Sequence, residues 1–358
     1  MDQQTIHSIL SGRARGPGAS LLRGLTWLLS KPYALLMRLR RGAYRHRLLR
    51  GHESPLPVLS VGNLTTGGTG KTPLVMWLCQ RLAAQRRSPV ILTRGYKAVA
   101  GRSDEAEMMW KATGVPVVAD PDRVSAAAEA ARAGADVLVL DDGFQHLPLR
   151  RDLDIVLVDA TNPFGYGHVL PRGLLREPRS ALRDADAVVI TRTEQAAPEA
   201  VAALRRELAA LAPRATMALS GHAASAVVLP GNRHLPPSLL AGKRAFAFCG
   251  IGNPESFFVT IRQAGAELVG QRAFDDHAAY DDAALFAVRD AAYAAGAEVI
   301  LTTAKDRVKL VNASLLGLPL WVLLVDIKLV EGEARLWALV EAALKRGSIA
   351  DCGLRNAD

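Results

Sequence analysis

Cysteine is scarce in this 358-residue chain. The three cysteines, Cys79, Cys249 and Cys352, stand far apart, and none belongs to a C-x-x-C pair. This spacing excludes a disulfide framework and the usual cysteine zinc sites, because both need clustered pairs. We therefore expect reduced thiols in a reducing compartment and no structural metal.

Long uncharged apolar runs are also missing. In the apolar N-terminal region the longest uncharged stretch covers residues 24–30, far below the roughly 20 residues that cross a bilayer. Charges interrupt that region and no A-x-A-like cleavage site follows it, so a secretory signal peptide is not predicted. The region can lie on a membrane, but its apolar length is too short to span one.

Acidic side chains are nearly absent from residues 1–50, where Asp2 stands against ten arginines and lysines. The segment thus holds the whole net charge of +9, and leucines, Trp27 and Tyr33 are interleaved with the basic residues. This pattern predicts a basic amphipathic helical segment on an anionic membrane surface. Two alternatives are a helical pair packed on the chain's own domain and a nucleic-acid-binding arm. We favour the membrane segment and expect no nucleic-acid partner.

The most informative stretch is residues 56–78, LPVLSVGNLTTGGTGKTPLVMWL. An apolar strand, a glycine-rich turn and an apolar helix follow one another there, which is the order of a phosphate-binding loop. In such a loop, backbone N–H groups and the helix N-terminus bind phosphates, Lys71 neutralises them and the Thr72 hydroxyl ligates Mg²⁺. The residues expected to bind the nucleotide are Thr65, Thr66, Gly67, Gly68, Thr69, Gly70, Lys71 and Thr72.

The match to the G-x-x-x-x-G-K-[ST] pattern is incomplete, since Thr65 stands at the first glycine position. Gly67 and Gly68 must then supply the turn. Pro73 is compatible with the helix, because a proline in the first turn removes no intrahelical hydrogen bond. The loop therefore predicts ATP or GTP as a ligand, with a glycine-rich turn that binds nothing as the alternative.

Predicted strands and helices alternate beyond this loop, which is typical of a mostly parallel sheet with helices on both faces. Asp120 and Gly134 are expected to cap the two ends of one helix. The strands are expected near residues 90–93, 116–119, 137–140, 154–158 and 187–191, and further helices near 71–85, 104–113 and 198–211.

The length and the composition, 49% hydrophobic and 22% charged, suit about two globular domains. The alternation lapses at residues 222–243, where three prolines and two glycines indicate a linker or hinge. Further strands are expected within 245–257, 298–303 and 320–325, and a helix near 332–345. The predicted division is an N-terminal helical segment 1–50, a P-loop domain 51–221, the linker 222–243, a smaller α/β domain 244–346 and a tail 347–358.

Two adjacent aspartates follow the apolar strand at residues 137–140. Ligands of open α/β sheets bind beyond the carboxyl ends of strands, and a P-loop enzyme needs an acidic group there for Mg²⁺. Asp141 and Asp142 suit this role, and only one should reach the metal, since successive strand residues point to opposite faces. The alternative is that both cap the next turn. His146, in the same DDGFQH motif, is either a ligand-binding or a structural histidine.

Arginines on two other turns are expected at the same edge of the sheet. Arg94 follows the second strand, and Arg172 and Arg176 lie in the stretch LPRGLLREP. A loop arginine can neutralise the charge on a transferring phosphoryl group. The alternative for each is a solvated or salt-bridged surface residue.

Taken together, the motifs resemble those of the tetraacyldisaccharide 4'-kinase family, whose loop also carries the threonine at the first position. The motifs, which cover about residues 20–345, are SVGNLTTGGTGKTP, LTRGYK, DDGFQH, LPRGLLREP, FCGIGNPESF, DDHAAY and TTAKDRVKL. The resemblance implies two α/β domains and the ATP- and Mg²⁺-dependent phosphorylation of the 4'-hydroxyl of an acylated glucosamine disaccharide 1-phosphate, in lipid A biosynthesis. It also implies a peripheral location on the cytoplasmic face of the inner membrane. No obligate protein partner is expected.

The resemblance extends to two catalytic residues. The family's G-D-E motif is matched by Ser103-Asp104-Glu105, and its D-H-H motif by Asp276-His277-Ala278, which lacks the second histidine. A sugar hydroxyl is a poor nucleophile, so Asp104 is the expected base, and His277 is expected to orient it. The alternative role for Asp104 is a helix N-cap.

The remaining site residues carry charge or bind substrate. Lys71 and Arg176, the arginine of the L-R-E-P stretch, are assigned to the transferring phosphoryl group. Arg94 and His146 are assigned to substrate binding. Arg172 departs from the family pattern, in which a small residue is usual at that position.

Two other classes of P-loop protein are alternatives to this family. A GTP-binding switch needs a guanine-reading N-K-x-D motif, which Lys305-Asp306-Arg307 does not supply. A membrane-associated partitioning or assembly ATPase is the alternative hypothesis. Such an ATPase would hydrolyse ATP with no acceptor present, whereas a lipid kinase would do so slowly.

Overall fold

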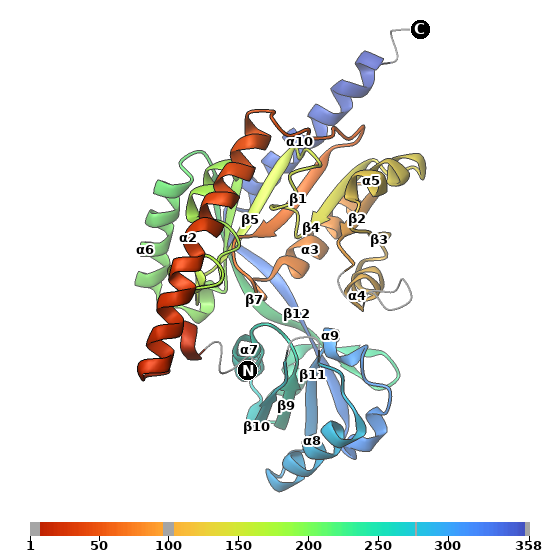
Figure 1. The fold of residues 1–358 in the computed structure, drawn as a ribbon. Coiled ribbons are helices and arrows are strands. Elements are labelled where there is room, and N and C mark those ends of the chain that lie inside the picture. Colours follow the sequence, from red (N-terminus) through yellow and green to blue (C-terminus); the bar gives the residue numbers. More distant parts are fainter. Residues whose placement is uncertain (1–7, 96–103, 276–277, 355–358) are drawn as a thin grey trace.

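The computed structural model describes residues 8–95, 104–275 and 278–354, with the backbone alone at 104–105 and 347–354. Two α/β lobes lie one above the other, joined by a long pair of strands (Figure 1). One mostly parallel sheet, flanked by helices, continues through both lobes. The predicted fold class is confirmed.

The first lobe contains a parallel sheet in the order β6-β5-β1-β4-β2-β3. Except for β3 at the edge, its strands are buried along their full length, as expected where helices cover both faces. The strands are β1 (Val58–Asn63), β2 (Pro89–Thr93), β3 (Val117–Ala119), β4 (Val137–Asp141), β5 (Leu153–Asp159) and β6 (Ala187–Thr191). The strands predicted from the alternating pattern are therefore present.

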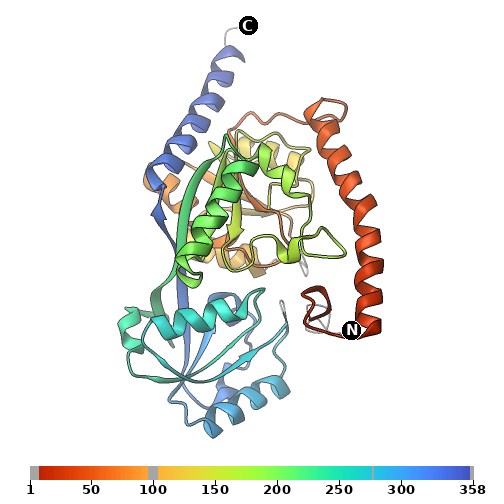
Figure 2. The same ribbon diagram turned by 90° about the vertical axis from the view of Figure 1, so that its left-hand side faces the viewer.

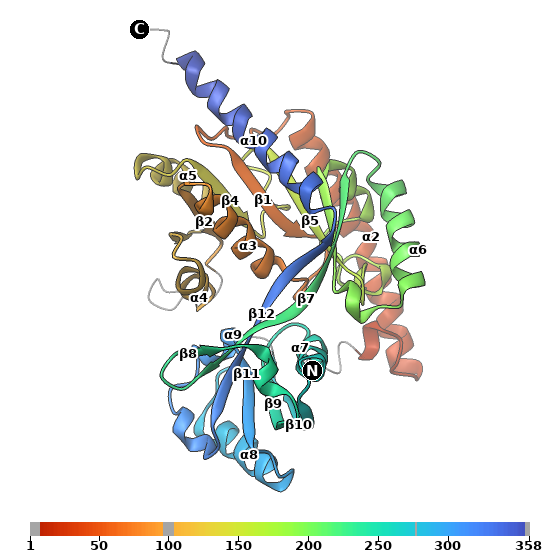
Figure 3. The same cartoon turned by 180° about the vertical axis from the view of Figure 1, so that it is seen from behind.

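Helices pack on both faces of this sheet. One core cluster joins the sheet to Leu74 of α3, Met109 of α4 and Trp337 of α10, and Figure 3 shows α3 and α10 on the same face. Two other clusters join the opposite face to Ala127 of α5 and Leu208 of α6. The helices are α3 (Lys71–Ala84), α4 (Asp104–Thr113), α5 (Arg123–Arg132), α6 (Pro198–Leu211) and α10 (Glu333–Leu354).

The second lobe is a smaller parallel sheet in the order β10-β9-β11-β12. Its two faces have separate apolar cores, one around Phe257 of α7 and the other around Phe248 and α8. The elements are β9 (Arg244–Cys249), α7 (Pro254–Gln263), β10 (Glu267–Ala273), α8 (Asp282–Ala294), β11 (Val299–Thr303), α9 (Ala304–Arg307) and β12 (Leu320–Glu331).

The predicted linker at residues 222–243 contains regular secondary structure. Residues 222–229 belong to β7 (Thr216–Leu229), which pairs antiparallel with β12 and parallel with β6, so the sheet is continuous between the lobes (Figure 3). The chain then turns back into β8 (Arg233–Leu235), which pairs with β7. The prolines lie beyond the strand ends, where a missing N–H breaks no ladder bond. They mark the ends of two strands within the predicted linker.

Two helix boundaries also differ from expectation. Asp122, not Asp120, caps α5, because the Asp122 carboxylate accepts hydrogen bonds from the N–H groups of Val124 and Ser125. Helix α10 continues to Leu354 through most of the predicted tail. A lone glycine at 347 does not stop a helix when no proline follows it.

Helix α2 (Pro17–Arg45) is the helical segment predicted within residues 1–50. It lies along the side of the first lobe (Figure 2). The Arg41 guanidinium contacts Glu177 at 2.5 Å and Asp184 at 3.0 Å, and the Tyr33 hydroxyl donates to the carbonyl of Arg176 at 2.8 Å. One face of α2 is therefore anchored on its own domain by buried polar contacts.

The opposite side of α2 is apolar and exposed. Its leucines recur at helical spacing and keep about half or more of their surface in solvent. They are Leu21, Leu25, Leu28, Leu29, Leu35, Leu36 and Leu39. Among the described residues, none of the helices has the length and apolar character needed to cross a bilayer. One face of helix α2 thus packs on the first lobe, and the other presents a stripe of exposed leucines.

Candidate active site

A cavity of about 1300 Å³ lies between the lobes, beyond the carboxyl ends of β1 and β4. The phosphate loop, the end of β4 and the first turns of α7 line it, together with the middle of α2 at Tyr33, Met37 and Arg40. Ligand sites of open α/β sheets occur at this edge. Both lobes contribute side chains to one chamber.

The phosphate loop connects β1 to α3 as the sequence predicted. Gly67 (φ 116°) and Gly70 (φ 89°) adopt backbone angles that favour glycine, and Gly70 is the N-cap of α3. Thr65 needs no such angle. It is buried and forms a β-bridge with Leu175, so the missing first glycine is replaced by a strand contact. The first glycine with a positive φ, which forms the turn, is Gly67, two residues after Thr65.

Lys71 begins α3 and points back across the loop. Its Nζ donates to Asn63 Oδ1 at 3.1 Å and lies 3.4 Å from Asp142 Oδ1. Thr72, the next residue, lines the cavity. An ammonium and a hydroxyl are thus held at the helix N-terminus, where the helix dipole already favours anions.

Asp142 lies between two cations. Its carboxylate contacts Arg176 Nη1 at 2.5 Å as well as Lys71, and its backbone is left-handed (φ 55°). Burial acts to raise the pKa of Asp142, but Lys71 and Arg176 outweigh it, so the pKa lies below its usual range. The group is a carboxylate at neutral pH.

Asp141 is the last residue of β4 and is buried. Its charge acts on the Cys79 thiol of α3, whose pKa is raised mainly by burial and then by Asp141. Asp141 and Asp142 therefore face different neighbours, as expected for successive residues at a strand end. The two aspartates nevertheless line the same cavity.

The residues expected to hold Mg²⁺ are Thr72, Asp141 and Asp142. Within the described residues, no three His, Cys, Asp or Glu side chains form a ready-made metal site. Mg²⁺ in nucleotide sites usually takes one or two carboxylates together with phosphate oxygens and water. A hydroxyl and two strand-end carboxylates beside the loop fit that donor set.

Both backbone polar groups of Arg176, its N–H and its carbonyl, are hydrogen-bonded. Its N–H donates to the carbonyl of Leu64, and its carbonyl accepts from Tyr33 of α2. Arg172 points elsewhere and donates to the carbonyl of Leu10 at 2.8 Å. Of the two arginines in LPRGLLREP, only Arg176 reaches the cavity among its described lining residues.

Arg94 and His146 also line the cavity. Burial, together with the positive charges of Arg123 and Arg151, lowers the pKa of His146 to about 4. The imidazole is therefore neutral at physiological pH. It can exchange hydrogen bonds with a hydroxyl but cannot neutralise a phosphate.

The structure does not describe the side chains of the two residues assigned to base catalysis. His277 is outside the described residues. Asp104 is the first residue of α4, and its side chain is also outside them. Met108 and Ala112 of the same helix line the cavity. Asp104 thus starts a helix that borders the chamber.

Sequence reasoning missed Arg192, at the end of β6. Its Nη2 donates to the carbonyl of Gly68 at 2.6 Å, its Nε donates to Ser256 Oγ at 3.0 Å, and its Nη1 pairs with buried Asp159. Arg192 therefore ties the phosphate loop to α7 of the second lobe. Its position at the carboxyl end of a parallel strand was the available signal.

His222 was also missed, because it lies inside the expected linker. A Cβ added to Gly70 would come within 2.9 Å of His222 Nε2, so the imidazole packs directly against the phosphate loop. Burial, followed by the charge of Arg192, lowers the pKa of His222 to about 4. The second lobe approaches the same loop closely: a Cβ on Gly252 would lie 2.7 Å from the amide nitrogen of Gly68.

A glycine loop between strand and helix, a lysine and threonine after it and acidic groups on the adjacent strand define a P-loop nucleotide-binding α/β protein. The description "Tetraacyldisaccharide-1-P 4'-kinase" belongs to the family model that matches residues 22–345. The chain belongs to this family of kinases. The family resemblance is confirmed, and the hypotheses of a GTP switch and of a partitioning ATPase are set aside.

Individual relatives agree with this assignment. The tetraacyldisaccharide 4'-kinase of Anaeromyxobacter sp. (strain Fw109-5) is 39% identical, over 96% of this chain and 98% of the relative. That of Geobacter metallireducens is also 39% identical, over 81% and 89%. Among solved structures, LpxK from Aquifex aeolicus in complex with ATP is 27% identical, with a TM-score of 0.69, over 90% of this chain and 99% of that one.

Proposed function

We propose that this kinase transfers the γ-phosphate of ATP to the 4'-hydroxyl of a tetraacylated glucosamine disaccharide 1-phosphate in lipid A biosynthesis. The observation that carries the proposal is the group of Lys71, Asp142 and Arg176 at the phosphate loop, in a chain of this kinase family. The cavity exceeds the roughly 300–1,000 Å³ of ordinary small-ligand pockets. It has room for a nucleotide and a second substrate.

The phosphate loop and the N-terminus of α3 bind the triphosphate through backbone N–H groups. Lys71 then exchanges its contact with Asp142 for phosphate oxygens, and Arg176 neutralises charge on the transferring group. Thr72, Asp141 and Asp142 hold Mg²⁺, which supplies Lewis-acid stabilisation of the phosphates when bound. Arg94 and the neutral imidazole of His146 bind the acceptor.

Asp104 is the base in this mechanism. It takes the proton of the 4'-hydroxyl while the new O–P bond forms and the bond between the γ-phosphorus and the bridging oxygen of ADP breaks. His277 fixes the orientation of the carboxylate. What supports these roles is the match to the family motifs and the position of α4 beside the cavity.

Replacement of the base tests the mechanism. We expect Asp104→Ala to lower kcat by about 100-fold or more and to leave the Kd for ATP nearly unchanged, because general-base catalysis acts only in the transition state. Glu107→Gln, at an exposed position of the same helix, is the matched control. Turnover of Asp104→Ala close to that of the control would remove Asp104 from the mechanism.

We further propose a peripheral location on the anionic cytoplasmic face of the inner membrane. The exposed leucines of α2, with arginines along the same helix, support this location. Apolar side chains enter the headgroup region while basic groups add about 1 kcal/mol each near an anionic surface. The acceptor is a lipid of the same membrane, so α2 brings the cavity to its substrate.

A further inference from the structure

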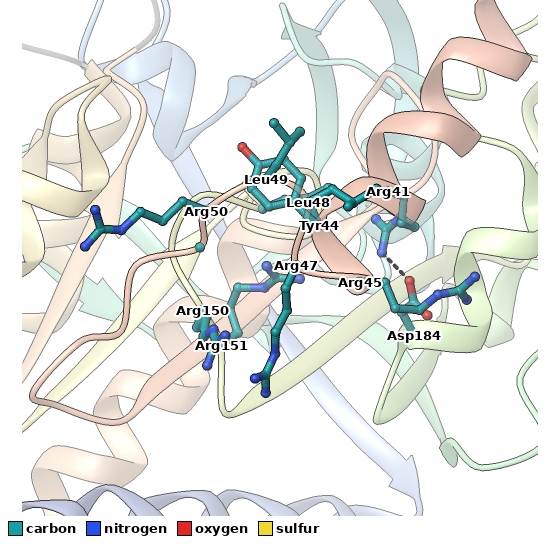
Figure 4. A pocket seen from close by; sticks show the side chains of 12 residues that line it. Arg41, Tyr44, Arg45, Arg47, Leu48, Leu49, Arg50, Arg150, Arg151 and Asp184 are labelled. Atoms are coloured by element: carbon teal, nitrogen blue, oxygen red, sulfur yellow. Dashed lines mark hydrogen bonds and ion pairs between the residues drawn. The ribbon is translucent and has the colours of Figure 1, made fainter.

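A second pocket, of about 520 Å³, lies at the C-terminal end of α2 (Figure 4). It shares no lining residue with the cavity at the phosphate loop. The end of α2, residues 47–51 and the loop that leads into β5 surround it. None of the catalytic assignments involves this place.

The pocket is strongly cationic. Six arginines line it, namely Arg41, Arg45, Arg47, Arg50, Arg150 and Arg151, with Asp184 as the one acidic lining residue. Three of the arginines are neutralised: Arg41 by Glu177 and Asp184, Arg150 by Glu53, and Arg151 by Asp154. The others are not.

The positive excess comes from Arg45, Arg47 and Arg50. Within the described part of the chain these three side chains make no hydrogen bond and no ion pair, and all three are exposed. Arg45 ends α2, Arg47 and Arg50 follow it, and Figure 4 shows the three side chains pointing in different directions. Three uncommitted guanidinium groups around one pocket suit a phosphate, which accepts several charge-assisted hydrogen bonds.

The backbone that carries these arginines is fixed. The N–H groups of Leu48 and Leu49 both donate to the carbonyl of Ala43, at 2.8 and 3.2 Å, and Arg47 takes a left-handed angle (φ 59°) to close the turn. The last carbonyls of α2 also carry partial negative charge, which stabilises the neighbouring cations. The backbone positions of the turn that carries Arg47 are therefore fixed next to the end of α2.

Apolar surface adjoins the charge. Leu48 is 80% exposed and Leu49 44% exposed, and both line the pocket. They extend the exposed leucine stripe of α2 past its C-terminus. A ligand that fits this surface carries a phosphate next to an apolar body, which describes an anionic phospholipid.

We propose that this pocket binds the headgroup phosphate of an anionic membrane phospholipid, separately from the acceptor. The inference rests on the peripheral membrane location proposed above. One lipid bound at the C-terminal end of α2 fixes that end on the bilayer, while the leucine stripe lies along it.

The test compares two triple variants with the same loss of charge. Arg45→Gln/Arg47→Gln/Arg50→Gln removes the pocket arginines, and Arg13→Gln/Arg15→Gln/Arg38→Gln removes three exposed arginines of the same segment outside the pocket. The probe is dihexanoyl phosphatidylglycerol below its micelle concentration, titrated calorimetrically into the full chain. We expect one-to-one binding by the wild type and the control, and at least about tenfold weaker binding by the pocket variant.

Equal weakening in both variants would mean diffuse attraction and would overturn the proposal, as would no binding by the wild type. The acceptor's own 1-phosphate is the other source of this chemistry. We therefore expect the KM for the acceptor in neutral detergent micelles to be the same in the pocket variant and the wild type. A tenfold higher KM would assign the pocket to the acceptor and overturn the proposal.

The proposed function fails in a different way. Wild-type protein that transfers no phosphate in neutral micelles contradicts the kinase mechanism, yet leaves the lipid titration readable. Wild-type protein that does not bind phosphatidylglycerol vesicles contradicts the membrane location itself. Each failure thus has its own measurement.

Discussion

At the scale of single residues, the buried His222 makes stability depend on pH. Its pKa is about 4 in the folded chain and about 6.5 when unfolded. Between these values the unfolded chain binds more protons, so the free energy of unfolding falls as pH falls from 6.5 and levels off below 4. His222 thereby changes the free energy of unfolding by about 3 kcal/mol at most over this pH range.

We expect His222→Gln to flatten this part of the stability curve. The measurement is chemical denaturation between pH 4 and 8, with His234→Gln on the exposed β8 as control. Part of the slope remains in the His222→Gln variant with the same sign, because the pKa of His146 is also about 4. An unchanged slope in His222→Gln would show that this imidazole is not held neutral by burial.

Site residues with a motif could be predicted from the sequence, and those without one could not. Lys71, Asp142 and Arg176 belong to recognisable stretches, and the structure brings them within contact distance. Arg192 and His222 reach the phosphate loop only because β6 and β7 lie beside it. Their role depends on sheet order, which a single sequence does not state.

At the scale of elements, Arg192 connects the end of β6 to the phosphate loop and to α7. Arg192→Lys keeps a positive charge beside Asp159. It removes the planar guanidinium group, which donates to the Gly68 carbonyl and the Ser256 hydroxyl at the same time. We expect the KM for ATP to rise by about tenfold and kcat to change less, since loop position affects ground-state and transition-state binding alike.

Gln195→Ala is the control for this prediction. The Gln195 side chain donates to the same Ser256 hydroxyl at 3.1 Å but does not contact the phosphate loop. We expect its kinetics to stay near those of the wild type. If Gln195→Ala and Arg192→Lys raised KM equally, the contact with α7 rather than with the loop would carry the effect.

Helix α2 gives a prediction for membrane binding. Leu21→Asn/Leu28→Asn places two amides in the exposed stripe, where Leu21 is 76% and Leu28 61% exposed. We expect vesicle affinity to drop by about tenfold or more, because the apolar contact with the bilayer is lost. The melting temperature should not change. Val311→Asn/Val330→Asn, on exposed apolar positions outside α2, is the matched control.

Vesicle binding equal to that of the control would contradict a role for the leucine stripe.

Deleting residues 1–50 would also remove the basic charge of this segment, but it is a poorer test of membrane binding. The deletion would leave Glu177, which is 1% exposed, without its partner Arg41. A buried charge that loses its partner costs about 3–5 kcal/mol, so stability and membrane binding would change together.

Elements with strong periodicity were predictable. The parallel strands of the first lobe read as apolar runs between turn residues, and all of those predicted are present. Strand β7 was missed because its second half is rich in alanine and lies next to a proline cluster. It is a strand because β12 pairs with it, and that partner lies about 100 residues later in the sequence.

At the scale of the whole molecule, one sheet links two lobes around a shared chamber. The strand pair β7 and β12 carries the backbone hydrogen bonds from one lobe to the other. Gly68 and Gly252 lie close together, with no side chains between them, at a further contact between the lobes. The two α/β units were predictable from the sequence, but their continuity through a common sheet was not.

The proposed activity is phosphoryl transfer to one hydroxyl of a lipid acceptor. The most direct measurement supplies γ-labelled ATP and Mg²⁺ in neutral detergent, with either the tetraacylated disaccharide 1-phosphate or its 4'-deoxy analogue. We predict one labelled phosphate per disaccharide, none on the analogue, and little free phosphate without acceptor. Label on the 4'-deoxy analogue, or rapid release of free phosphate that does not depend on the acceptor, would contradict this activity.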